Sequence, residues 1–138
     1  MQEQLITFET AKLAKEKGFL IHSIDTFYQF DGSISLCHPM SIRANDCKDI
    51  NKPECYAPHQ AFLQKWLREV HNIHLNLSYY QQYNEETPFY DITIDYIDKS
   101  GKMNYHEHRI KTSTKYEDVL EAGLHEALKL IEIVKCEK

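Results

Sequence analysis

A change of hydrophobic period at Asn72 constrains the fold of this chain more than any other feature. Before Asn72, large apolar residues recur at the spacing of one helix face: Phe62, Leu63, Trp66, Leu67 and Val70. After it, Ile73, Leu75, Leu77 and Tyr79 alternate with polar residues, which is the period of a strand. The sequence therefore predicts a helix from Pro58, a residue tolerated in a first helical turn, that leads directly into a strand.

Two more strands and a helix are predicted after this point. Residues 90–96 alternate between apolar and polar side chains, and residues 99–102 predict a hairpin turn. Residues 103–112 alternate poorly, which indicates a bulge or an edge strand.

Thr114 and Glu117 have the spacing of a capping box before the last helix. Gly123 would let that helix approach the sheet closely, and we expect Trp66 and Leu128 in the shared core. The predicted core face is Tyr116, Val119, Leu120, Leu124, Ala127, Leu128, Ile131 and Val134.

The first part of the chain predicts a helix over residues 8–17, with Thr7 as N-cap and Gly18 as the stop. Residues 19–30 have strand-like composition, and Asp31-Gly32 before residues 33–36 predicts a β-hairpin. Residues 37–57 show no period and are interpreted as a long surface loop.

These patterns predict an α+β fold with an N-terminal helix and β-hairpin, then a helix, a three-stranded antiparallel sheet and a helix, with the helices packed on one sheet face. A chain of 138 residues can bury a usable core, so we expect a single domain. Its parts would be residues 1–36 (helix and hairpin), 37–57 (loop) and 58–134 (helix, three strands, helix).

Composition excludes some classes of protein. The net charge of −5 argues against a general nucleic-acid binder, and no apolar run approaches the length of a membrane span. The polar N-terminus lacks a signal peptide, so a cytoplasmic location is expected. Cysteines in that compartment would be thiols or ligands, not disulfides, and they are Cys37, Cys47, Cys55 and Cys136.

Two groups of residues could bind a metal. His106 and His108 would share a face of a strand, with His74 or Asp95 as a third ligand. Cys37, His38, Cys47 and Cys55 could hold zinc within the loop, but they lack the close cysteine pairs of zinc-binding motifs. We predict no bound zinc, no cofactor and no disulfide.

No catalytic motif surrounds the cysteines, and Asp91, Asp95 and the histidines are the only acid–base candidates. A solvated polar sheet face explains them more simply, so we expect a protein that is not an enzyme.

The order helix, three strands, helix resembles the double-stranded RNA-binding domain over roughly half of the chain. That family contacts phosphates partly through lysines at the start of its last helix. Here that helix opens with Lys115, Tyr116, Glu117 and Asp118, whose acids would repel phosphate. The resemblance therefore implies a shared topology, and nucleic-acid binding is an alternative that the charges oppose.

Three stretches of sequence carry a second resemblance, namely ITFETAKLA (residues 6–14), LQKWLREVHNIH (63–74) and EAGLHEALKLI (121–131). They resemble a family of small uncharacterised proteins encoded by bacteriophages and prophages of gut anaerobes. The resemblance spans nearly the whole chain except residues 37–56, and it implies a phage context without assigning catalytic residues.

A phage accessory protein of this size would act by binding. One hypothesis is that it sequesters a small anionic ligand, such as a nucleotide-type defence signal, in a concave pocket. The alternative is that it binds a host protein through an exposed apolar patch. We expect a homodimer, and the candidate ligand-binding residues are Arg43, Arg68, His71, Tyr80, Arg109 and Lys111.

Overall fold

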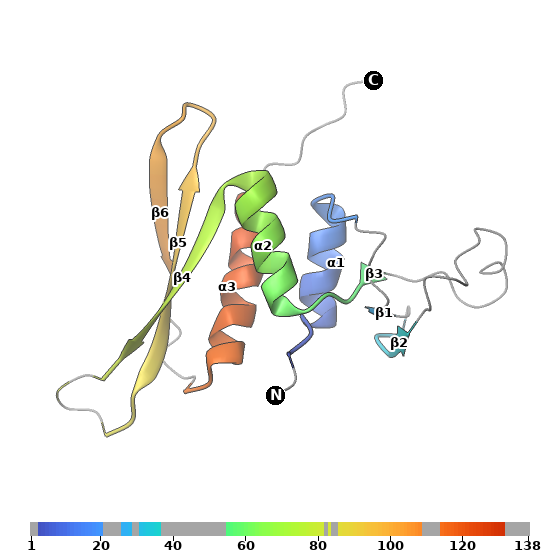
Figure 1. Ribbon diagram of the computed structural model, residues 1–138, viewed down its shortest axis with the longest axis horizontal. Helices are drawn as coiled ribbons and strands as arrows, with labels where there is room; N and C mark the ends of the chain where they lie inside the picture. Colours follow the sequence, from blue (N-terminus) through green and yellow to red (C-terminus); the bar gives the residue numbers. More distant parts are fainter. Residues whose placement is uncertain are drawn as a thin grey trace, which may run out of the picture. The chain divides into compact units, whose positions relative to one another are not determined.

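The computed structural model describes residues 3–20, 26–28, 31–36, 55–81, 83, 86–108 and 114–131. The chain divides into two compact units, residues 1–59 and residues 60–138, and each is described by itself. The helices and strands are, in order, α1 (Phe8–Glu16), β1 (Thr26–Tyr28), β2 (Ile34–Leu36), β3 (Cys55–Tyr56), α2 (Gln60–His71), β4 (Ile73–Tyr80), β5 (Phe89–Ile97), β6 (Met103–His108) and α3 (Tyr116–Leu130) (Figure 1).

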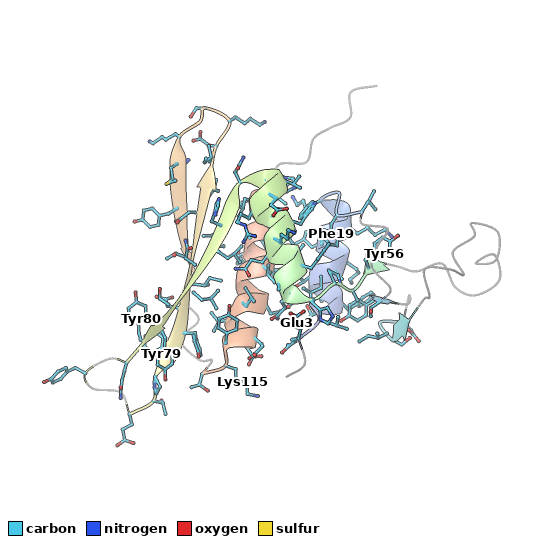
Figure 2. All side chains as sticks on the ribbon, in the orientation of Figure 1. Glu3, Phe19, Tyr56, Tyr79, Tyr80 and Lys115 are labelled. Carbon is cyan, nitrogen blue, oxygen red and sulfur yellow. The ribbon has the colours of Figure 1, made fainter. Side chains whose placement is uncertain are left out.

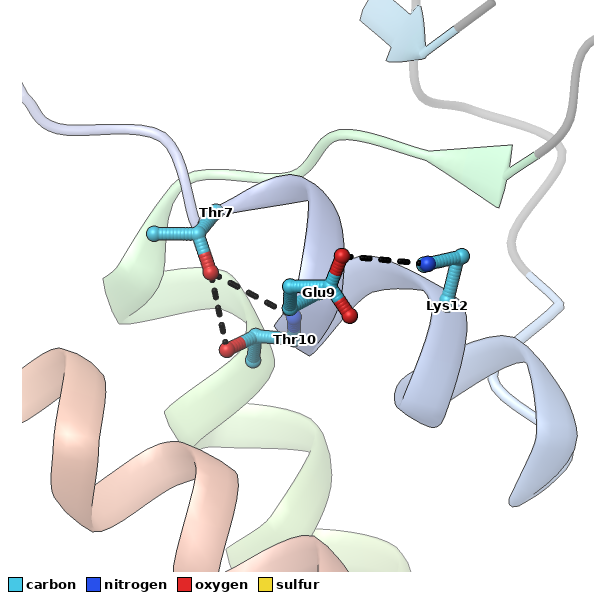
Figure 3. Close-up of polar contacts among 4 residues, drawn as sticks. All are labelled: Thr7, Glu9, Thr10 and Lys12. Carbon is cyan, nitrogen blue, oxygen red and sulfur yellow. Dashed lines mark hydrogen bonds and ion pairs between the residues drawn. The ribbon is translucent and has the colours of Figure 1, made fainter. Parts of the chain in front are cut away.

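The N-terminal helix forms as the sequence predicts. Thr7 is the N-cap of α1, and its hydroxyl accepts a hydrogen bond from the backbone N–H of Thr10 at 3.3 Å (Figure 3). This bond satisfies one of the N–H groups that a helix start leaves without a partner. Gly18 follows the helix with a φ of +91°, a left-handed conformation that glycine adopts without strain.

The predicted hairpin is also present. β2 pairs antiparallel with β1, from Thr26↔Leu36 to Tyr28↔Ile34, and the Asp31 carboxylate accepts the backbone N–H of Ser33 in the turn. The Tyr28 hydroxyl donates to the Ile6 carbonyl at 2.6 Å, which fixes the segment before α1 to this sheet.

The predicted loop over residues 37–57 is wrong at its end. Cys55 and Tyr56 form β3, which pairs with β1 and gives the strand order β2-β1-β3. A two-residue strand is too short to show alternation, so the sequence carried no signal for it. Residues 37–54 of the predicted loop, and residues 21–25 and 29–30 of the strand-like stretch, lie outside the described residues.

The switch from helix to strand is confirmed in the second unit. α2 ends at His71, Asn72 adopts a left-handed φ of +53°, and β4 starts at Ile73. β4, β5 and β6 form an antiparallel sheet in that order, so β6 is an edge strand as expected. Its register with β5 is constant from Ile92↔His108 to Ile97↔Met103, which means that this part of the strand has no bulge.

Both helices of the second unit pack on one face of this sheet (Figure 1). Leu63 and Leu67 of α2, Leu124 and Leu128 of α3, and Ile92 and Ile94 of β5 are fully buried. Gly123 explains how closely α3 approaches, because a Cβ at this position would overlap with Ile92 Cδ1. The predicted close approach at Gly123 is confirmed.

The buried stripe of α2 is narrower than predicted. Phe62 and Val70 are exposed, Trp66 is only partly buried, and Gln60 takes a core position instead. Gln60 can be buried because its amide donates to the Glu117 carbonyl and to the Glu121 carboxylate, both at 3.0 Å. The prediction that Trp66 lies in the core beside Leu128 is therefore wrong.

The predicted capping box at Thr114 is wrong as well. The N-cap of α3 is Lys115, which makes no side-chain capping bond, and its carbonyl accepts the N–H of Val119. The helix thus starts one residue later than the box requires. Tyr116 is exposed instead of buried, and Val134 lies outside the described residues. No helix among these residues is long and apolar enough to cross a bilayer.

Candidate functional site: the open face of the C-terminal sheet

The face of the β4-β5-β6 sheet that points away from α2 and α3 is the candidate functional site, here called the open sheet face. Along β4, Ile73 and Leu75 are buried beneath the helices. The alternate residues His74 and Asn76 point the other way and are exposed. Cross-strand partners share a face, so the register defines the other positions. The described positions of the open sheet face are His74, Asn76, Ser78, Tyr80, Phe89, Asp91, Thr93, Asp95, Ile97, Met103 and Tyr105.

The described positions of the open sheet face carry negative charge. They include Asp91 and Asp95, and none of these described positions is a lysine or arginine. Asp95 Oδ2 accepts a hydrogen bond from Asn76 Nδ2 at 2.8 Å, which holds the carboxylate on the sheet surface. Asp91 is buried, and its Oδ1 accepts the backbone N–H of Ile92 at 3.1 Å. This surface therefore repels anions and is complementary to cations.

Large apolar side chains are exposed at one end of the same face. Ile97 is 46% exposed, Met103 71% and Tyr105 74%, and the three residues lie next to the turn between β5 and β6. Single exposed apolar residues are common, but an exposed group with polar neighbours is typical of a protein interaction surface. In the sequence, this exposed apolar group is visible only as the poor alternation of residues 103–112. The pairing of β6 with β5 is needed to see that Met103 and Tyr105 share a sheet face with Ile97.

Aromatic residues gather at the other end of the sheet. Tyr80 contacts Phe89 on the open sheet face, with ring centroids 6.1 Å apart. On the helix side, Tyr90 contacts both Tyr79 at 5.0 Å and Tyr116 at 5.6 Å. Figure 2 shows Tyr79 and Tyr80 at the end of β4 that is distant from Asn72. This end of the sheet therefore presents aromatic rings on both faces.

The turn between β5 and β6 is held by one carboxylate. Asp98 accepts hydrogen bonds from the Ser100 side chain and backbone, from the Asn104 amide and from the Lys102 backbone. These bonds, with the Ser100 side chain first, lower the pKa of Asp98 to about 2. The hairpin that carries Met103 and Tyr105 is thus locked at its turn.

Of the six predicted ligand-binding residues, the structure describes three, and these lie in two separate places. Arg68 and His71 lie at the end of α2, whereas Tyr80 is at the far end of the eight-residue strand β4. At about 3.3 Å per residue, Tyr80 lies roughly 23 Å from the start of that strand. Arg43, Arg109 and Lys111 lie outside the described residues.

His71 has a local role in the structure. Its ring packs edge-on against Trp66 with centroids 4.5 Å apart, and burial lowers its pKa. Its Nε2 is buried and has no hydrogen-bond partner among the described residues. An imidazole in this setting is favoured in its neutral form, which disfavours contact with a phosphate.

The register also separates the predicted metal ligands of the sheet. His106 pairs with Ile94 and His108 with Ile92, whereas His74 pairs with Asp95, which in turn pairs with Tyr105. His74 and Asp95 therefore occupy strand positions that alternate with those of the two β6 histidines. Within the described ranges, no group of three or more His, Cys, Asp or Glu residues could hold a metal ion.

The prediction that the loop binds no zinc is not tested for most of the residues concerned. Cys37, His38 and Cys47 lie outside the described residues, as does Cys136. Cys55 is a buried free thiol in β3.

Comparison of the chain with protein-family models, with curated proteins and with solved structures found no match.

Proposed function

We propose that this protein acts without catalysis, by binding a partner protein through the open sheet face. The observation that carries the proposal is the exposure of Ile97, Met103 and Tyr105 beside the acidic residues of the same face. Apolar side chains supply the attraction in such an interface, and polar residues around them fix its orientation.

Charge complementarity indicates the chemistry of the partner. Asp95 favours a partner surface that bears lysine or arginine, because no basic residue is found among the described positions of the open sheet face. The same charges disfavour a small anionic ligand on this face. The resemblance to phage-encoded proteins would make the partner a protein of the bacterial host.

Nucleic-acid binding is the weaker alternative. The second unit has the element order of a double-stranded RNA-binding domain, but Glu117 and Asp118 are exposed in the first turn of α3. Phosphates bind where a helix start is basic or uncharged, so these two carboxylates would weaken such contacts.

The experiment compares two charge reversals of equal size. Asp95→Lys alters the open sheet face, and Glu69→Lys alters the exposed side of α2, outside the sheet. Each tagged variant and the wild type would be used to capture proteins from a lysate of the bacterial host, followed by binding measurements with the purified partner. Fluorescence of Trp66, the single tryptophan, would show that both variants are folded.

We expect Asp95→Lys to lose the partner and Glu69→Lys to retain it. Binding should also weaken as salt rises, because exposed charges are screened over roughly 8–10 Å at physiological ionic strength. Equal binding by both variants would contradict a role for the open sheet face. If calorimetry with a panel of cyclic and linear nucleotides shows tight binding and no protein is captured, sequestration replaces partner binding.

A further inference from the structure

We propose that two copies of this chain associate through their β6 strands, paired antiparallel with Tyr105 of each copy at the two-fold axis. The inference concerns the free edge of β6 and does not depend on the identity of the partner proposed above. Among the described strands, β6 pairs only with β5, so no described strand pairs with its outer edge.

The hydrogen-bond pattern determines which residues of β6 point outward. The Asp98 N–H donates to the Lys102 carbonyl at 3.0 Å, so this opposite pair is bonded. In an antiparallel ladder, bonded and non-bonded pairs alternate. The backbone groups of Met103, Tyr105 and Glu107 therefore point away from β5 and are available to a second strand.

A second copy of β6 satisfies these groups in one register. When Tyr105 lies opposite Tyr105 of the other copy, Met103 lies opposite Glu107. Each residue whose backbone groups point outward then faces a residue of the other copy whose backbone groups also point outward. Asn104 then lies opposite His106, so no two carboxylates and no two ammonium groups face each other. The two tyrosines would form a cross-strand aromatic pair, which stabilises antiparallel sheets.

Two common devices against strand addition, a proline or basic residue and a bulge, are missing from the described part of this edge. Residues 103–108 contain no proline, lysine or arginine, and their pairing with β5 is free of bulges. The two most exposed apolar residues of the open sheet face, Met103 and Tyr105, lie on this strand. Pairing of two copies would place both beside a second strand and leave them on the same sheet face.

The pairing would have a defined geometry. A two-fold axis perpendicular to the sheet would join two three-stranded sheets into one sheet of six strands. Helices α2 and α3 of both copies would lie on the same side, and the two open sheet faces would become one continuous surface. This dimer therefore extends the proposed binding surface instead of blocking it.

The first test measures oligomeric state by light scattering after gel filtration and by sedimentation. Tyr105→Lys places a charge at the axis, where two lysines would meet, while leaving the β5–β6 bonds intact. The matched control is Val70→Lys on α2, which makes the same kind of change at a residue that is 59% exposed. We expect the wild type and Val70→Lys to be dimers and Tyr105→Lys to be a folded monomer.

The second test is covalent. Opposite residues of a bonded antiparallel pair have Cα atoms about 5.5 Å apart, a distance that a disulfide can span. Tyr105→Cys should therefore form a disulfide-linked dimer under mild oxidation, above the level seen with the wild type. Thr93→Cys, on the central strand β5, should not.

The proposal is overturned if the wild type is monomeric across the concentration range, or if Tyr105→Lys remains dimeric. It is also overturned if both lysine variants become monomeric, because the effect would then not be specific to the β6 edge. Loss of the partner in Asp95→Lys while dimerisation persists would leave this inference intact, so the two proposals fail separately.

Discussion

Gly123 sets the distance between α3 and the sheet, and replacing it with alanine is the sharpest stability test that the fold offers. A Cβ at this position would overlap with Ile92 Cδ1 and lie 3.2 Å from both Ile92 Cγ1 and Leu75 Cδ2. Ile92 is fully buried and Leu75 nearly so, which leaves neither side chain space to move aside. The helix must therefore shift or the core must strain.

Two opposing effects decide the magnitude. Overpacking a tight core costs about 1–3 kcal/mol. Alanine is favoured over glycine in a helix by about 1 kcal/mol. We expect the steric cost to exceed the helix preference, because the overlap is with a buried side chain, and the net loss in the free energy of unfolding to be about 0–2 kcal/mol.

The assay is urea denaturation followed by Trp66 fluorescence, which reports on the second unit because Trp66 is the only tryptophan and lies on α2. Ile92→Val removes the overlapping Cδ1 atom and alone should cost about 0.5–1.5 kcal/mol. The double variant should be less destabilised than the sum of the two single variants, since the valine makes room for the alanine. Additive losses, or a Gly123→Ala variant that is more stable than the wild type, would refute this account of the helix–sheet contact.

Three further predictions concern single side chains. Thr7→Ala should lower the free energy of unfolding, measured by circular dichroism in urea, by about 1 kcal/mol, because the N-cap bond is lost. Thr114 is not the N-cap of α3, so the control Thr114→Ala should change this free energy by less than about 0.5 kcal/mol. Burial lowers the pKa of His71 in the folded protein below its ordinary value of 6.5. As the pH falls through 6.5, the unfolded chain is therefore protonated at His71 before the folded protein is, and the free energy of unfolding decreases. In a His71→Gln variant, the free energy of unfolding, measured by Trp66 fluorescence, should depend less on pH in this range. An unchanged dependence on pH would contradict the prediction. Asp98 should titrate with a pKa of about 2 in carboxyl NMR spectra. Its contribution to the free energy of unfolding is therefore fully present above its ordinary pKa of 3.8 and is lost as the pH falls through about 2. A measured pKa near the ordinary value would mean that the hydrogen bonds of the turn do not form.

Much of the fold follows from local signals in the sequence. The period change at Asn72, the N-cap at Thr7 and the Asp31-Gly32 turn each depend on residues that are neighbours in the chain. The core positions of α3 were also predictable, because one regular apolar face of a long helix has few alternatives.

Other features depend on tertiary contacts that no local pattern encodes. Trp66 and Val70 have the spacing of core residues, but α2 packs through a narrower face and leaves them partly or fully at the surface. Gln60 is buried because Glu117 and Glu121, distant in sequence, offer acceptors.

In the candidate site, too, some features follow from local sequence patterns and others depend on tertiary contacts. The alternation of β4 and β5 predicts a polar sheet face, and this is what the structure has. The candidate residues Arg68 and His71 lie apart from Tyr80, because the length of strand β4 separates them. The separation of His74 and Asp95 from the positions of His106 and His108 depends on the register, which no single strand reveals.

The direct junction at Asn72 has a consequence for how related chains can diverge. Since a single left-handed residue joins α2 to β4, there is no slack to absorb an inserted or deleted residue. One extra residue there would move every side chain of β4 to the opposite face and exchange Ile73 and Leu75 with His74 and Asn76. Length variation among descendants of this chain should therefore be found beyond Tyr80, where the strand pairing ends, while the spacing between Leu67 and Leu75 stays constant over evolutionary time.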